Sequence, residues 1–373
     1  MFPYIAIVVI IIFFLLLSSA QVADSGKVGL VVVAAALSTV AGFRAMSVGT
    51  DTRTYSTMFY WIAGCSDLSS AFTVSTINAP VYVFYAWVLG RLGLSHQALL
   101  LFNAIVTNTG IAIFAKRTSD NPLIPILIYF CLGLYFQSLN GMRQYVAIAL
   151  AINAYLDFYY YGIRKPRAWV LFLLASGIHN TVLILLPGIG AALYLRKQDH
   201  KRKGLCFVSA IAALFSLSLV ALSNVFMDLF PIYSMYDGVQ NIALFSGAYQ
   251  GRIRYLYAVL LVICVFGFLS LDKKDGDKTE TKEINLIFAL FPLCIISGIV
   301  GLVYGTSSLI NRLLWFYMPG YIAFIPAVVN NTEKGWAILL RFGIATVLLI
   351  WLIAQFVENQ DDMLPYALGM GLF

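Results

Sequence analysis

The sequence predicts an all-α polytopic membrane protein with roughly 11–13 membrane helices. The first observation is composition: 61% of the 373 residues are hydrophobic and 11% are charged, with a mean hydropathy of +0.86. The second is a series of apolar runs, each close to the length that crosses a bilayer. Neither a Gly/Ser linker nor a soluble domain separates these runs, so we predict one integral membrane domain over residues 1–373.

Ten apolar segments are candidates for membrane crossings, because a spanning helix takes about 20 mostly apolar residues. We expect these crossings near residues 2–19, 28–43, 97–115, 122–137, 144–161, 205–223, 254–271, 284–304, 313–330 and 337–356.

A further apolar stretch, Ala168 to Leu195, lies between two basic loops and is too short to cross the membrane twice. As a helix it is about 42 Å long, whereas two crossings need about 60 Å. We therefore predict a dipping hairpin with His179 and Asn180 near its middle.

The lysines predict the orientation of the chain, because basic loops stay on the cytoplasmic side. The cytoplasmic loops are expected near residues 162–167, 196–204 and 272–283. Extracytoplasmic loops are expected near 44–78 and 224–253, provided that residues 79–95 do not cross. We predict that residues 79–95 lie along or dip into the outer face, because the stretch is short and interrupted by glycines.

In this orientation all eleven lysines face the cytoplasm, and six arginines face the other side. The six are Arg44, Arg53, Arg143, Arg252, Arg254 and Arg312. An arginine at the edge of a bilayer is costly unless it meets an anion, and its planar fork matches phosphate. We therefore expect a site for the diphosphate of a lipid-linked substrate. The alternative for each single arginine is lipid-headgroup contact or anchoring of a helix end.

The net charge of +7 comes from the orienting lysine loops, so we expect no nucleic-acid partner. The five cysteines are scattered and most lie within apolar stretches. We expect neither a metal site nor a cofactor, because no metal-ligand spacing occurs.

Transfer of a sugar to a hydroxyl group also needs a general base, which is usually a histidine or a carboxylate. The candidates are Asp51 in the loop Val48-Gly49-Thr50-Asp51 and His179 in the predicted hairpin. Each has a structural alternative. Asp51 fits a loop cap or an ion-pair partner of a nearby arginine, and His179 fits a hydrogen-bonded packing residue.

The ordered set of these motifs resembles the EpsG family of Wzy-type polysaccharide polymerases from bacterial envelopes. The matching residues are Phe43-Arg44, Val48-Gly49-Thr50-Asp51-Thr52, Tyr55, Arg143-Gln144-Tyr145, Ala147, Ala175, His179-Asn180 and Asn311-Arg312. The resemblance adds Gln144, Tyr145 and Asn180 to the expected substrate-binding residues, beside catalytic roles for His179, Asp51 and Arg143. Where the family usually has an acidic residue before a proline, this chain has Ala79-Pro80.

The resemblance implies a GT-C-like layout, that of the lipid-linked glycosyltransferases, in the bacterial cytoplasmic membrane. The implied reaction passes a growing glycan from undecaprenyl diphosphate to the non-reducing end of a new lipid-linked repeat unit. It would take place on the extracytoplasmic face, without a metal and with inversion. A flippase and a chain-length regulator would be its partners, besides membrane lipids.

Two alternatives remain open at this point. A ligase of the O-antigen type differs in its acceptor, which residues alone do not reveal. A flippase or transporter for lipid-linked sugars is disfavoured, because the chain has no inverted repeat and few charged residues within its core helices.

Overall fold

The computed structural model describes residues 1–75, 77–198, 201–229, 247–271, 282–304, 308–359 and 362–369. In these residues the regular structure is helical, apart from an isolated β-bridge between Arg44 and Leu368. Five helices in the described part are long and apolar enough to cross a membrane, and a bent pair makes a sixth if it is counted as one span. The chain is an all-α polytopic membrane protein, as its composition predicts.

The chain divides into two compact units, each assembled from separate stretches of sequence. The first unit comprises Met1–Asp157, Ile163–Leu183 and Arg341–Phe373, and the second comprises Phe158–Gly162 and Ile184–Leu340. Neither unit is therefore a contiguous domain.

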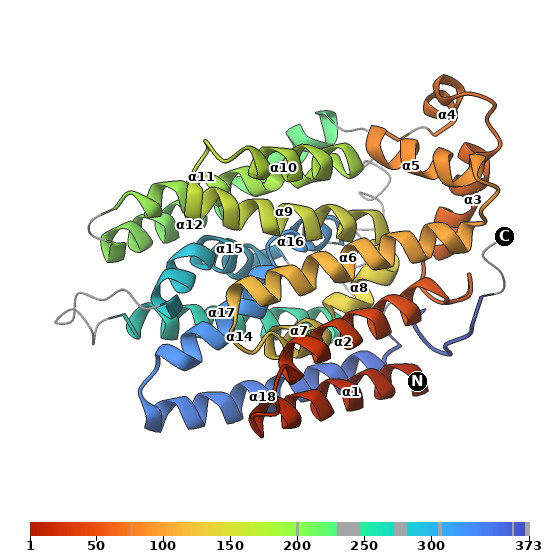
Figure 1. Cartoon of the computed structure of the whole chain (residues 1–373). Coiled ribbons are helices and arrows are strands. Elements are labelled where there is room, and N and C mark those ends of the chain that lie inside the picture. Colours follow the sequence, from red (N-terminus) through yellow and green to blue (C-terminus); the bar gives the residue numbers. More distant parts are fainter. Residues whose placement is uncertain are drawn as a thin grey trace. The chain divides into compact units, whose positions relative to one another are not determined.

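The first unit contains the helices of the N-terminal half of the chain and most of the last helix (Figure 1). They are α1 (Phe2–Ser19), α2 (Ser25–Gly42), α3 (Thr52–Ala63), α4 (Leu68–Val74), α5 (Pro80–Arg91), α6 (His96–Thr118), α7 (Leu123–Cys131), α8 (Leu134–Asn140), α9 (Met142–Tyr161), α10 (Pro166–Ile178) and α18 (Lys334–Val357). The last residues of α9 and the first of α18 belong to the second unit.

Helices α1, α2 and α6 pack side by side, and small residues let their backbones approach closely. A side chain at Gly29 of α2 would collide with Phe14 of α1, and one at Gly42 would collide with Leu101 of α6. Close approach at glycines replaces the hydrophobic driving force that is missing between helices in lipid. These three helices form the scaffold from which the loop after α2 emerges.

The single crossing predicted near residues 122–137 is broken in the structure. Helices α7 and α8 are bent by 63°, and Gly133 adopts a φ of 82° between them. Two side chains of α18 donate to the carbonyls at this break: Trp351 Nε1 to Leu132 at 3.2 Å and Gln355 Nε2 to Cys131 at 3.3 Å. A helix can break within a membrane protein when neighbours satisfy the exposed carbonyls in this way.

The stretch 79–95 forms α5, which has 12 residues. A helix of that length covers about 18 Å of a hydrocarbon core of about 30 Å, so α5 is too short to cross by itself. The predicted hairpin 168–195 likewise consists of short pieces, α10 and α11 (Leu186–Arg196), with the 3₁₀ helix η1 (Asn180–Leu185) between them. The helical pattern is interrupted at His179, where the sequence predicted the turn.

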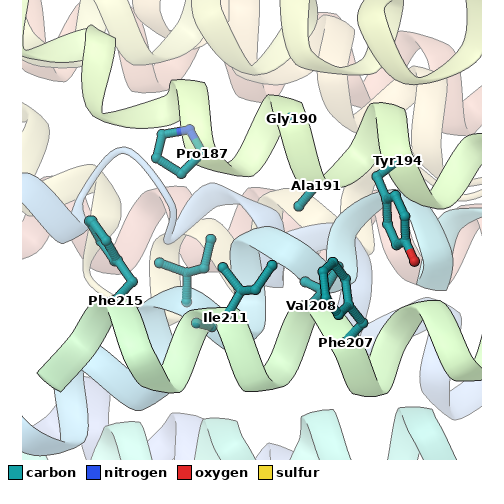
Figure 2. A pocket seen from close by; sticks show the side chains of 10 residues that line it. Pro187, Gly190, Ala191, Tyr194, Phe207, Val208, Ile211 and Phe215 are labelled. Atoms are coloured by element: carbon teal, nitrogen blue, oxygen red, sulfur yellow. The ribbon is translucent and has the colours of Figure 1, made fainter. Parts of the chain in front are cut away.

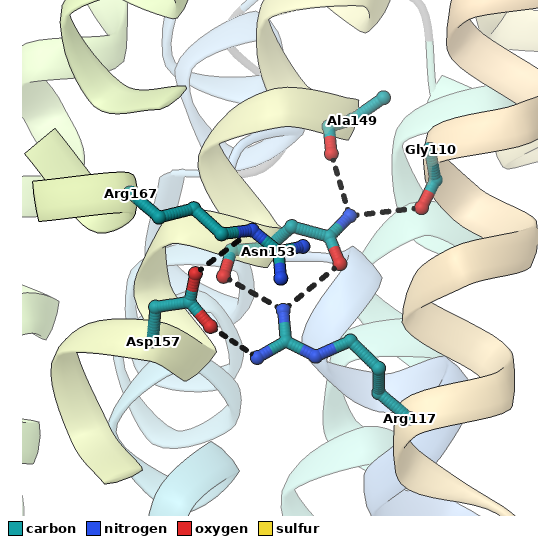
Figure 3. Close-up of polar contacts among 6 residues, drawn as sticks. All are labelled: Gly110, Arg117, Ala149, Asn153, Asp157 and Arg167. Carbon is teal, nitrogen blue, oxygen red and sulfur yellow. Dashed lines mark hydrogen bonds and ion pairs between the residues drawn. The ribbon is translucent and has the colours of Figure 1, made fainter. Parts of the chain in front are cut away.

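A buried polar network fixes α6, α9 and α10 to one another (Figure 3). The Arg117 guanidinium of α6 pairs with Asp157 of α9 and donates to the Asn153 carbonyl at 3.0 Å. Asp157, which is 1% exposed, also pairs with Arg167 Nε of α10 at 3.4 Å. Asn153 Nδ2 donates to Gly110 of α6 at 2.9 Å. Asp157 lies late in α9 and Arg167 lies early in α10, so this pair joins the end of one helix to the start of the next.

The second unit is organised around α15 (Lys282–Tyr304), which contacts α11, α12, α14, α16 and α17. Its other helices are α12 (Lys201–Leu229), α14 (Gly247–Leu269), α16 (Ser308–Leu314) and α17 (Pro319–Asn331). Much of the predicted extracytoplasmic loop 224–253 and most of the predicted cytoplasmic loop 272–283 lie outside the described residues.

Candidate functional site

The loop that carries Asp51 is shaped by Gly49, whose φ is 92°. A Cβ at Gly49 would lie 2.8 Å from Asn140 Oδ1 and 2.9 Å from Thr52 Oγ1, so only glycine fits between α8 and the start of α3. The Thr52 hydroxyl donates to the Val48 carbonyl at 2.7 Å and closes the turn. Asp51, which is half-buried, is thereby held at the N-terminus of α3.

Arg44 is buried beneath this loop, with 1% of its surface exposed. Its Nη2 donates to the Leu139 carbonyl at 2.7 Å, its Nε donates to Thr52 Oγ1 at 3.3 Å, and its Nη1 donates to the Ala41 carbonyl. Burial lowers the pKa of the Arg44 guanidinium to about 10, so the group stays charged near neutral pH. These contacts tie the ends of α2, α8 and α3 together.

A C-terminal strap, residues 362–369, covers the same loop with backbone hydrogen bonds. The Ala45 amide donates to Ala367 at 2.8 Å, and the Gly49 amide donates to Asp362 at 2.9 Å. The Gly369 amide donates to Phe43 at 2.7 Å. Sequence reasoning did not find this strap, because pairing through the backbone leaves no side-chain pattern.

Arg143 has a different environment from Arg44. Its guanidinium carbon lies 5.3 Å from the centroid of the Tyr82 ring of α5, which is within the range of a cation–π interaction. Its Nε is buried and has no hydrogen-bond partner. The Tyr82 side chain is fully buried, and its hydroxyl also has no partner. The Arg143 and Tyr82 side chains therefore contact each other, and each has a buried polar group without a hydrogen-bond partner. Tyr82 is not among the residues that the sequence predicts for the site.

Helices α3 and α5 run parallel, which brings their N-termini together. At their far ends Gly90 packs against Ala63, and Trp87 Nε1 donates to the Cys65 carbonyl at 3.2 Å. At their N-terminal ends Tyr55 of α3 and Tyr82 of α5 are close enough to interact electrostatically. Figure 1 shows α3, α4 and α5 gathered at one end of α6. The start of α3, with Asp51, thus lies by the start of α5.

His179 caps α10 at the same level as Arg143. From the Asp157–Arg167 pair, Arg143 lies about 21 Å back along α9, and His179 lies about 18 Å forward along α10. Gly177 of α10 packs directly against Val81, the neighbour of Tyr82. The end of α10 and the starts of α5 and α9 therefore meet.

The His179 ring is oriented by a contact of 2.6 Å between its Nδ1 and Thr181 Oγ1. In the tautomer whose Nδ1–H donates to Thr181, Nε2 is the atom that can accept a proton. His179 and Asn180 are both partly exposed, so a substrate hydroxyl can reach this end of α10. This geometry suits a general base.

The remaining predicted residues of the first unit have different surroundings. Gln144 and Tyr145 are buried, and the Tyr145 hydroxyl donates to Gln137 Oε1 at 2.7 Å, which fastens α9 to α8. Arg53 is exposed on α3. The pair Gln144 and Tyr145 thus holds the helix that carries Arg143.

Three predicted arginines belong to the second unit. The Arg312 guanidinium lies 5.9 Å from the Trp315 ring centroid, and the neighbouring Asn311 accepts a hydrogen bond from Tyr257 at 3.1 Å. Arg254 is exposed on α14, whereas the side chain of Arg252 lies outside the described part.

The cluster in the first unit has the electrostatics of an anion site. The N-termini of α3, α5 and α9 meet there, and the N-terminus of a helix carries partial positive charge and free amide groups. The Arg143 guanidinium adds a full charge at the same place. Such an arrangement can bind a phosphate group and stabilise charge that develops on it.

The fold and this cluster define a polytopic helical membrane protein whose first unit brings Arg143, three helix N-termini and two candidate bases together. The model of the EpsG family matches residues 27–368, and the chain belongs to this family. EpsG proteins are polysaccharide polymerases of the Wzy type, which places the chain in membrane polysaccharide biosynthesis. Comparisons with curated proteins and with solved structures give no match.

Proposed function

We propose that this protein polymerises lipid-linked oligosaccharide repeat units. The growing glycan is transferred from undecaprenyl diphosphate to the non-reducing end of a new lipid-linked repeat unit. The reaction takes place on the extracytoplasmic face of a bacterial cytoplasmic membrane, where a separate flippase delivers the repeat units and a chain-length regulator acts on the product.

The observation that carries the proposal is the surroundings of Arg143. Its Nε is buried without a partner, and it lies beside Tyr82 where three helix N-termini meet. A leaving diphosphate needs hydrogen-bond donors that point at its oxygens while its bond to the anomeric carbon breaks. Arg143 is therefore assigned to the leaving diphosphate.

The base that we assign first is His179, because Thr181 orients its ring and its position on α10 brings it level with Arg143. It accepts the proton of the acceptor hydroxyl as that oxygen bonds to the anomeric carbon and the bond to the diphosphate breaks. Attack from the face opposite the diphosphate inverts the anomeric configuration. Asp51 at the start of α3 is the second candidate for the base.

The other arginines take different parts in the proposal. Arg44 positions the Asp51 loop, because protein acceptors occupy its guanidinium. Arg53 is exposed and available to substrate. Arg252, Arg254 and Arg312 remain predicted diphosphate-binding residues, and Asn180 contacts the acceptor beside His179.

Incubation of the purified protein with a defined undecaprenyl-diphosphate oligosaccharide tests the proposal. We expect a ladder of products that differ by one repeat unit, with inverted configuration at each new linkage. A single transfer to a core acceptor without a ladder would indicate a ligase. Movement of the lipid-linked sugar across vesicles without any new linkage would indicate a flippase, and either result would overturn the proposal.

A further inference from the structure

The second unit contains an apolar groove between α11 and α12, far along the sequence from Arg143. The groove has a volume of about 280 Å³. Helix α11 contributes Pro187, Gly190 and Tyr194, and α12 contributes Phe207, Ile211 and Phe215. Figure 2 shows Tyr194 and Phe207 at one end of the groove and Pro187 and Phe215 at the other.

The groove is open along one side. Phe207 is 51% exposed and Ile211 is 48% exposed although both line it. A Cβ added at Gly190 would meet nothing within 4 Å, so the space continues over the backbone of α11. On α12 the exposed residues Phe207, Ile211 and Leu214 recur at helical spacing, which is typical of a face turned to hydrocarbon. The groove therefore suits a lipid chain that enters from the side.

One end of the groove is aromatic and leads to exposed cations. The rings of Tyr194 and Phe207 lie with centroids 5.2 Å apart. One turn beyond them lie Lys197 on the α11 side and Lys203 on the α12 side, at spacings that place each cation on the face of its aromatic residue. Both lysines are exposed. Gly204 packs against Leu195, which keeps the two helix ends together.

An apolar groove that ends in aromatic rings and then in two cations matches the chemistry of an amphiphile with an anionic head. We propose that the groove binds one acyl chain of an anionic phospholipid, whose phosphate lies against Lys197 and Lys203. These cations belong to a loop predicted to be cytoplasmic, so the lipid comes from the cytoplasmic leaflet. The groove lies within the second unit, and this proposal does not rest on the proposed transfer of glycan.

Native mass spectrometry of the full-length protein in detergent tests the proposal, with phosphatidylglycerol and phosphatidylcholine as probes. We expect one retained phosphatidylglycerol and weaker retention of phosphatidylcholine. The variant Gly190→Phe fills the groove and should lose that lipid. Its control is Gly343→Phe, because Gly343 is also an exposed helical glycine with open space at its Cβ. The control should retain the lipid.

A second pair of variants keeps the test decisive if the groove variant folds poorly. Removal of two cations in Lys197→Gln with Lys203→Gln should weaken phosphatidylglycerol retention about fivefold per cation, whereas Lys116→Gln should not. Equal retention of both lipids by the wild type, or equal losses in the groove and control variants, would overturn the proposal. Displacement of phosphatidylglycerol by undecaprenyl-diphosphate glycan would also overturn it, because the groove would then hold the donor lipid. The readout is binding, so the result is independent of polymerase activity.

Discussion

At the scale of single residues, the arginines of the predicted diphosphate site have different surroundings. Arg44 is enclosed by the carbonyls of Ala41 and Leu139 and by Thr52, whereas Arg143 has a buried Nε without a partner. Arg53, nine residues after Arg44, is exposed. Three arginines of one sequence pattern therefore lie in three different environments.

Replacement of Arg44 should damage the fold first. In Arg44→Ala the buried carbonyls lose their donors, and we expect the free energy of unfolding to fall by about 2–4 kcal/mol. Thermal melting in detergent measures this loss. Arg53→Ala is the matched control and should melt with the wild type. Equal melting of the two variants would show that the buried contacts of Arg44 contribute little.

Tyr82 should act through its ring on Arg143. We expect Tyr82→Leu to reduce the rate of polymer formation about fivefold, because it removes a cation–π interaction of about 1 kcal/mol. Tyr82→Phe keeps the ring and should retain more activity. The rates are measured from the product ladder at saturating donor, with melting temperature as a check on folding. A Tyr82→Leu variant as fast as the wild type would exclude this role.

Part of the site could be predicted from the residues, and part could not. The motifs around Asp51, Arg143 and His179 were visible because charged residues are conspicuous in an apolar chain. Tyr82 was not, since a tyrosine in a short apolar helix is also typical of a membrane interface. The burial of Arg44 could not be predicted either, because its partners are mostly backbone carbonyls. Every residue type has a backbone carbonyl, so the sequence does not show which ones accept from Arg44.

At the scale of helices, the network of Arg117, Asp157 and Arg167 holds the end of α9 against the start of α10. At their other ends Arg143 of α9 and Gly177 of α10 both contact α5, which brings Arg143 near His179 in the candidate site. The network lies at the end of α9 opposite the site, so its effect on chemistry is through helix position.

Loss of Asp157 should therefore destabilise the first unit strongly. Asp157→Ala leaves Arg117 without its buried counter-ion, and we expect a cost of about 3–5 kcal/mol. Asp24→Ala breaks the exposed ion pair with Lys27 and should leave the free energy of unfolding nearly unchanged, because solvent screens that pair. Chemical denaturation of the detergent-solubilised variants compares the two. A similar small cost for both would contradict the buried network.

The helices themselves were predictable to different degrees. The interruption at His179 followed from the short distance between two basic loops. The bend between α7 and α8 was missed, because its carbonyls are satisfied by Trp351 and Gln355, more than two hundred residues away in the chain. The C-terminal strap was missed for a related reason: it pairs with residues 43–49 through backbone groups.

At the scale of the whole molecule, the proposal requires that the Asp51 loop faces outward and that the lysines face the cytoplasm. The fold class follows from composition, but sidedness depends on α5 not crossing. Helix α5 has 12 residues, which agrees with a segment that does not span.

Cysteine labelling in intact cells measures this orientation. In a background with Cys65→Ser and Cys206→Ser, Ser47→Cys should react with an impermeant reagent added outside, because Ser47 is exposed in the loop after α2. Lys116→Cys, at the other end of α6, should react after detergent is added. The reverse pattern would contradict the proposed orientation.

The central claim is that the Arg143 cluster carries polymerisation, and the product ladder of an Arg143 variant tests it most directly. Arg143→Ala should remain folded and extend the glycan at least about a hundredfold more slowly, because a donor to the leaving group is lost. Arg91→Ala, which changes an exposed arginine at the far end of α5, should give the wild-type ladder. A wild-type ladder from folded Arg143→Ala would contradict the claim.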